Sequence, residues 1–131
     1  MDTRTKIISL DEALRLRSEG RRWALAAGAF DVLQAAHVRF LREIRSDGAL
    51  LLVAVYDDAS VGKPVLPEQA RAQLVAALAA VDYVILWPGP RLDSLIEQLR
   101  PERVGYAGHE RNIIEEVLKK QESGVRSQES E

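Results

Sequence analysis

The stretch WALAAGAFDVLQAAH, residues 23–37, decides the fold of this chain. It opens with five apolar residues, Trp23 to Ala27, and these are followed by Gly28. Alanine is a poor strand former, but a short apolar run that ends at a glycine is typical of a buried parallel strand. Gly28 allows a sharp turn of the backbone, and the helix expected next would place His37 in its first turn. The stretch therefore predicts a β-strand, a tight turn and the start of an α-helix.

The same alternation of strands and helices continues on both sides of this stretch. Ser9 begins a capping-box pattern, which predicts a helix that ends at Gly20. Further strands are predicted over residues 50–55, 83–87 and near 103–106, and further helices over residues 38–46, 67–80, 92–100 and roughly 111–120. This order predicts an α/β fold, a Rossmann-like three-layer sandwich with a parallel sheet of about four to five strands. We expect one domain over residues 1–120 and a disordered polar tail over residues 121–131.

Composition excludes several classes of function. The chain has 131 residues, a formal net charge of −2 and no cysteine, so disulfides, zinc–thiolate sites and thiol nucleophiles are excluded. Its longest apolar runs, residues 49–56 and 74–81, are too short for a membrane span, and no leader pattern opens the sequence. One arginine-rich helix face, which includes Arg39 and Arg42, is the only basic stripe. We therefore expect a cytoplasmic protein that binds neither nucleic acid nor membrane.

The functional site is expected where the strands end. Ligands of parallel α/β sheets bind beyond the carboxyl ends of the strands, which points to residues 28–37, 57–64, 88–90 and 105–110. In the first of these segments, Asp31 is placed to cap the helix or to bind a cation. His37 lies near the free amides and positive dipole of a helix start, which together favour a phosphate. The alternative interpretation is a plain turn, with Asp31 as a cap and His37 in solvent.

A family resemblance favours the phosphate site. The segment GAFDVLQAAH, residues 28–37, resembles the G-x-F-D-x-x-H-x-G-H signature of the cytidylyltransferase-like nucleotidyltransferases. The segments VAVYDDAS, KPVLPEQAR and ALAAVDYV, which begin at residues 53, 63 and 77, resemble further segments of that family in the same order. The chain is similar to the adenylyltransferase domain of the bifunctional heptose-phosphate enzymes and to glycerol-3-phosphate cytidylyltransferases.

The resemblance implies a reaction and a set of site residues. Such enzymes join a nucleoside triphosphate, here ATP or CTP, to a phosphorylated sugar or alditol, release pyrophosphate and usually require Mg²⁺. The match implies catalytic roles for three residues, His37, Gln34 and Lys63. It implies nucleotide-binding roles for seven residues, Gly28, Ala29, Phe30, Asp31, Ala36, Asp58 and Arg71. It implies no metal ligand among the side chains, and a homodimer is common among such relatives.

The chain also departs from the family pattern at several positions. Gln34 replaces the first histidine of the signature, Ala36 replaces its glycine, and the loop before Lys63 is shortened. Tyr106 stands where relatives have a lysine, and the final strand with its Ser/Thr-rich phosphate-binding turn is expected to be missing. The alternative function is therefore a catalytically impaired relative that binds a nucleotide, a phosphometabolite or a protein partner. Other nucleotide-binding folds are disfavoured, because neither G-x-x-x-x-G-K-S/T nor G-x-G-x-x-G occurs.

Overall fold

The computed structural model describes residues 2–45, 48–108 and 112–116. The described helices are η1 (Thr3–Lys6, a 3₁₀ turn), α1 (Leu10–Ser18), α2 (Ala35–Ile44), α3 (Asp58–Val61), α4 (Glu68–Ala76) and α5 (Asp93–Leu99). The described strands are β1 (Trp23–Gly28), β2 (Leu50–Tyr56), β3 (Tyr83–Trp87), β4 (Arg103–Ala107) and β5 (Asn112–Glu116). The predicted cap of α1 is present, because Ser9 Oγ accepts a hydrogen bond from the Glu12 amide at 3.2 Å.

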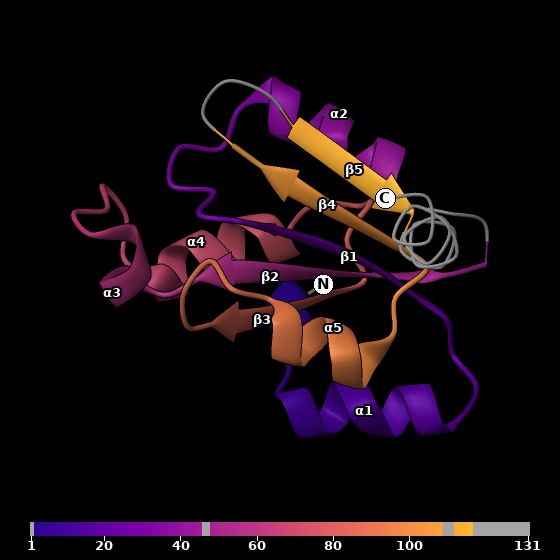
Figure 1. Ribbon diagram of the computed structural model, residues 1–131. Coiled ribbons are helices and arrows are strands. Elements are labelled where there is room, and N and C mark those ends of the chain that lie inside the picture. The colour runs from indigo at the N-terminus through magenta and orange to yellow at the C-terminus, as the bar shows by residue number, and fades with distance from the viewer. Residues whose placement is uncertain (1, 46–47, 109–111, 117–131) are drawn as a thin grey trace, which may run out of the picture.

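The five strands form one sheet in the order β3-β2-β1-β4-β5. The first four pair in parallel, and β5 pairs with β4 in the antiparallel direction. Helices α1 and α5 cover one face, and α2 and α4 cover the other (Figure 1). This arrangement confirms the predicted three-layer α/β sandwich.

Two apolar clusters hold the layers together, one on each face of the sheet. The first joins Phe40 and Leu41 of α2 to Val75 of α4, and the second joins Ala13 of α1 to Leu95 of α5. Every residue of β1 is buried, as are all residues of β2 except the last. Such two-sided burial explains why both strands are continuous apolar runs in the sequence.

The segment after β4 differs from its prediction. We expected a helix over roughly residues 111–120 and no final strand, but Asn112–Glu116 is the strand β5. The register pairs Gly105 with Ile114 and Ala107 with Asn112, so the ladder with β4 outweighs the local sequence pattern. The rest of that expected helix, and the polar tail expected over residues 121–131, lie outside the described residues.

Helices α4 and α2 end earlier than predicted, although α2 also begins earlier, at Ala35. Helix α4 was expected to reach Ala80 but ends at Ala76, where tighter turns follow. Lys6 Nζ donates to the carbonyl oxygens of Leu78 and Val81, at 3.2 and 2.9 Å, and fixes these turns. Helix α2 ends at Ile44, where the Arg103 guanidinium donates to the last carbonyls. In the part of the chain that the structure describes, no helix has the length and apolar character needed to cross a bilayer.

Gly105 allows α2 to pack closely on β4. A Cβ atom at this position would lie 2.8 Å from Phe40 Cε1 and would also meet Ile44 Cδ1. We expect Gly105→Ala to lower the free energy of unfolding by about 1–3 kcal/mol, the usual cost of an overpacked core, measured by urea denaturation. The double variant Gly105→Ala, Ile44→Val removes the clashing methyl group and should recover part of this loss. If the effects of the two substitutions on the free energy of unfolding are simply additive, the close approach of α2 to β4 does not limit stability.

Candidate functional site

A cavity of about 690 Å³ lies at the carboxyl ends of the parallel strands. Strands β2 and β3 lie to one side of β1 in the sheet, and β4 lies on its other side, so the strand order reverses at β1. Ligands bind at such a switch point in open α/β sheets. The lining residues come from the segments after β1, β2, β3 and β4: Ala29, Phe30, Asp31, Val32, Gln34, His37, Tyr56, Ser60, Val61, Lys63, Pro90, Ala107 and Gly108.

The floor of the cavity depends on a close approach between the ends of β1 and β4. A Cβ atom on Gly28 would lie 3.0 Å from Ala107 Cβ and 3.1 Å from Phe30 Cε2. Phe30 itself has a φ of 49°, a left-handed conformation that is uncommon for an aromatic residue. Its side chain is only 3% exposed, so burial of the ring stabilises the strained backbone. The chain therefore turns sharply after β1, and the next residues face the cavity.

His37 lies in the first turn of α2 with a defined proton position. Its Nδ1 accepts a hydrogen bond from the Gln34 amide at 3.0 Å, so the neutral ring carries its proton on Nε2. The ring packs edge-on against Phe30 with 5.4 Å between ring centroids. Burial lowers the pKa of His37 below its usual 6.5, which keeps the ring neutral at pH 7. His37 therefore offers an N–H donor beside the amides at the start of α2.

The other signature residues have different positions. Gln34 is the exposed N-cap of α2 and lines the cavity together with Ala29. Ala36 is exposed on the first turn of α2 and does not belong to the described cavity lining. The His37 amide already binds the Gln34 carbonyl at 2.9 Å, but the first turn of a helix has further amides without partners inside the helix, and these can bind an anion.

The turn interpretation expected Asp31 to cap α2. Instead, its carboxylate holds the loop that carries Lys63. Its carboxylate accepts hydrogen bonds from the amides of Val65 and Leu66, at 2.8 and 2.9 Å. These bonds, with a smaller effect from the nearby Arg71 cation, lower the pKa of Asp31. Asp31 therefore connects the turn after β1 to residues 62–67, which we call the lysine loop.

Arg71 is buried beneath the cavity and connects three segments of backbone. Its guanidinium donates to the carbonyl oxygens of Leu66, Ala29 and Tyr56 at 2.9, 2.8 and 2.7 Å. A fourth bond of 2.8 Å pairs it with Asp58 Oδ1. The side chain is 0% exposed, so the alternative interpretation of Arg71 as a solvated helix charge is wrong. Arg71 and Asp58 lie outside the described cavity lining, and direct contact of either with a nucleotide stays a prediction.

Several lining residues carry no catalytic signature, and the sequence analysis did not select them. Tyr56, Ser60 and Pro90 line the cavity because β2 ends beside β1 and β3 ends beside β2. Their signals in the sequence were positions just after predicted strands and, for Tyr56 and Ser60, a place in the segment VAVYDDAS. Lys63 also lines the cavity, from the exposed lysine loop, and its catalytic role stays a prediction.

The described residues do not form a metal site of their own. No group of three or more His, Asp or Glu side chains gathers anywhere within residues 2–45, 48–108 and 112–116. The carboxylates near the cavity have other partners, since Asp31 binds backbone amides, Asp57 binds Ser60 and Asp58 binds Arg71. These side chains do not fit a resident Mg²⁺ ion, so any Mg²⁺ would have to be held largely by the phosphates of a bound nucleotide.

The sequence and the fold match a known class of protein. The model of the Cytidylyltransferase-like family matches residues 25–126, and the chain belongs to this family. It is therefore a cytidylyltransferase-like nucleotidyltransferase domain.

Particular relatives are also similar. The Bifunctional protein HldE of Pseudomonas fluorescens is 36% identical over 106 residues, which cover 73% of this chain and 22% of that protein. The Bifunctional protein HldE of Magnetococcus marinus is 40% identical over 94 residues, which cover 67% of this chain and 19% of that protein. The chain thus spans about a fifth of the length of these relatives. Among solved structures, the lipopolysaccharide core biosynthesis protein from Thermoplasma volcanium has a TM-score of 0.56 at 29% identity, over 62% of this chain and 70% of that one.

Proposed function

We propose that this domain binds a nucleoside triphosphate in the cavity and transfers its nucleotidyl group to a phosphorylated sugar. The observation that supports this most is that His37, with its proton on Nε2, lines the cavity from the first turn of α2. An N–H donor at a helix start binds phosphate oxygens and stabilises negative charge that develops on them. Relatives named HldE, and the resemblance to heptose-phosphate enzymes, support ATP as donor and a heptose 1-phosphate as acceptor.

The proposed reaction needs positioning and charge stabilisation rather than a covalent enzyme intermediate. An oxygen of the acceptor phosphate forms a bond to the α-phosphorus of the nucleotide. The bond from that phosphorus to the bridging oxygen breaks, and pyrophosphate leaves with the electron pair. In this scheme His37 donates to the oxygen that gains charge, while Gln34 and Lys63 bind the leaving phosphates. Mg²⁺ would enter with the triphosphate, and no step is assigned to it.

A second candidate is nucleotide binding without turnover. Lys63 is the only cationic side chain among the described lining residues, and the Asp31 carboxylate lies in the same lining. Gln34 donates a hydrogen bond but carries no charge, unlike a protonated histidine at that position. One missing charge-assisted hydrogen bond typically costs about 1.5–3 kcal/mol, so several together favour binding over catalysis.

Melting curves and pyrophosphate release separate the two functions. We expect ATP or CTP with Mg²⁺ to raise the melting temperature, because a ligand at 100 times its Kd stabilises a protein by about 2.7 kcal/mol. We also expect pyrophosphate release when heptose 1-phosphate is added. Stabilisation without pyrophosphate release would support the binding function. If nucleotide gave no stabilisation and no pyrophosphate were released, both functions would be contradicted.

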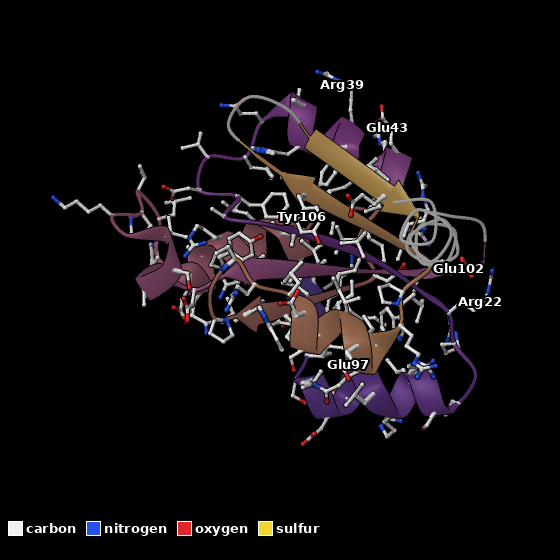
Figure 2. The ribbon with its side chains drawn as sticks, viewed as in Figure 1. Arg22, Arg39, Glu43, Glu97, Glu102 and Tyr106 are labelled. Carbon is white, nitrogen blue, oxygen red and sulfur yellow. The ribbon has the colours of Figure 1, made fainter. Side chains whose placement is uncertain are left out.

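A matched pair of variants tests the place of binding. Lys63→Gln removes the cation of the lysine loop and should reduce the stabilisation by nucleotide. Arg39→Gln makes the same kind of change on the outer side of α2, where Arg39 points away from the sheet (Figure 2). This variant should leave the stabilisation by nucleotide unchanged. Equal effects of the two variants would show that nucleotide binds elsewhere or through nonspecific charge.

A further inference from the structure

One side of the cavity is uncharged. Tyr56 at the end of β2 and Pro90 after β3 both line it, whereas the charged lining residues Asp31 and Lys63 belong to the turn after β1 and to the lysine loop. Tyr56 is directly beside Trp87 in the parallel register, so the two side chains lie next to each other on one face of the sheet. We call the uncharged side, where Tyr56 lines the cavity with Trp87 beside it, the aromatic side; the side with Asp31 and Lys63 is the polar side.

The two sides belong to opposite faces of the sheet. Phe30, which packs against His37, belongs to the apolar cluster under α2 and α4. Tyr56, Trp87 and Tyr106 pack against the other cluster, under α1 and α5. Tyr106 lies over the sheet near the end of β4 (Figure 2). A ligand whose phosphate binds at the start of α2 would thus place its uncharged part toward Tyr56.

The aromatic side is held in a fixed position. The indole N–H of Trp87 donates to the Arg91 carbonyl at 3.0 Å, and the Tyr56 carbonyl accepts from Arg71 at 2.7 Å. Ala27 and Ala54 occupy the row between Ile85 and Tyr106, so the side chains beside Tyr106 in this row are small. Burial, and to a smaller extent the nearby Tyr106, raise the pKa of Tyr56, which keeps its phenol neutral and able to donate a hydrogen bond.

We propose that Tyr56, supported by Trp87 and flanked by Pro90, selects an acceptor with a sugar ring over an acyclic alditol phosphate. This inference rests on the proposed function and assigns a specificity-determining residue to it. The C–H face of a sugar ring packs on an aromatic ring, and the phenol can donate to a ring hydroxyl. An acyclic phosphate such as glycerol 3-phosphate has no such face, so it gains little from this side of the cavity.

The test measures acceptor binding by calorimetry, independently of turnover, with heptose 1-phosphate and glycerol 3-phosphate as probes. We expect the intact chain to bind the heptose phosphate more tightly. Tyr56→Ala should weaken the affinity for heptose 1-phosphate about tenfold, as the loss of one aromatic contact predicts. The affinities for glycerol 3-phosphate and ATP should change by less than about twofold. Tyr56→Phe keeps the ring and should retain most of the preference.

A matched control and the contrary outcomes complete the design. Tyr83→Ala makes the same change at the amino end of β3, where Tyr83 packs on Trp23, and should leave the preference for the ring intact. Loss of ATP affinity in Tyr56→Ala would assign the aromatic side to the nucleobase and overturn the inference. Equal binding of both acceptors, or binding of neither while ATP still stabilises the chain, would overturn it and leave nucleotide binding intact. A chain that binds neither ATP nor acceptor would contradict the proposed function itself.

Discussion

Arg71→Met is expected to lower the free energy of unfolding by about 3–5 kcal/mol, measured by urea denaturation. The guanidinium is fully buried and satisfies three backbone carbonyls, those of Ala29, Tyr56 and Leu66. Methionine fills a similar volume but donates no hydrogen bond, so these carbonyls and the Asp58 carboxylate lose their partner. The same substitution should increase the mobility of the lysine loop, because Arg71 binds the Leu66 carbonyl of that loop.

The control for this prediction is Arg15→Met. Arg15 forms an exposed ion pair with Glu19 on α1, and its side chain is 62% exposed. Pairs of this kind contribute about 0–1 kcal/mol, so the control should unfold close to the unchanged chain. If Arg71→Met has an effect as small as Arg15→Met, the buried guanidinium does not hold the ends of β1 and β2 together.

His37→Gln is expected to reduce the rate of pyrophosphate release by about 10- to 150-fold, the loss expected for one charge-assisted hydrogen bond. Glutamine retains a donor but cannot reproduce the fixed Nε2–H of an imidazole whose Nδ1 is bound to the Gln34 amide. Steady-state assays with ATP and heptose 1-phosphate measure the effect, and Arg39→Gln is the control on the same helix. Unchanged turnover in His37→Gln would contradict the assigned role.

The pKa of His37 adds a pH signature to this variant. Burial lowers the native pKa below 6.5, so as the pH falls through 6.5 the unfolded state takes up a proton before the native state does. His37 therefore reduces stability as the pH falls from 6.5 to its lowered native pKa, and has no such effect above 6.5. A bound triphosphate favours the protonated ring, so ligand stabilisation should increase over the same range. Melting curves at pH 7.5 and 5.5, with and without ATP, should show both effects in the unchanged chain and neither in His37→Gln.

Local sequence patterns predicted most of the fold. Strand β2 was clear from an apolar run buried on both faces, and α1 was clear from its Ser9 cap. Part of the site was also predictable, because the segment from Gly28 to His37 joins β1 to α2 and lines the cavity. Lys63 was found through its place in a family segment rather than through any physical property of the loop.

Other features of the site were beyond local patterns. The partners of Asp31 are the amides of Val65 and Leu66, more than thirty residues away in the sequence. Tyr56 and Trp87 are neighbours only because their strands pair in a particular register. A short segment such as residues 112–116, with only two apolar residues, fits a helix or a strand equally well until an edge strand is available to pair with it.

The sequence alone therefore determined the order of the main strands and helices as far as β4, the family, and the turn after β1 that places His37 at the start of α2. These properties depend on neighbours in the chain: apolar periodicity, a helix cap, and a glycine that ends a short apolar run. Only the tertiary structure decided that β5 is a strand, that Arg71 is a buried connection, and that the cavity has an aromatic side at Tyr56. Those properties depend on strand register and on backbone carbonyls from separate segments, which come together only when the sheet has formed.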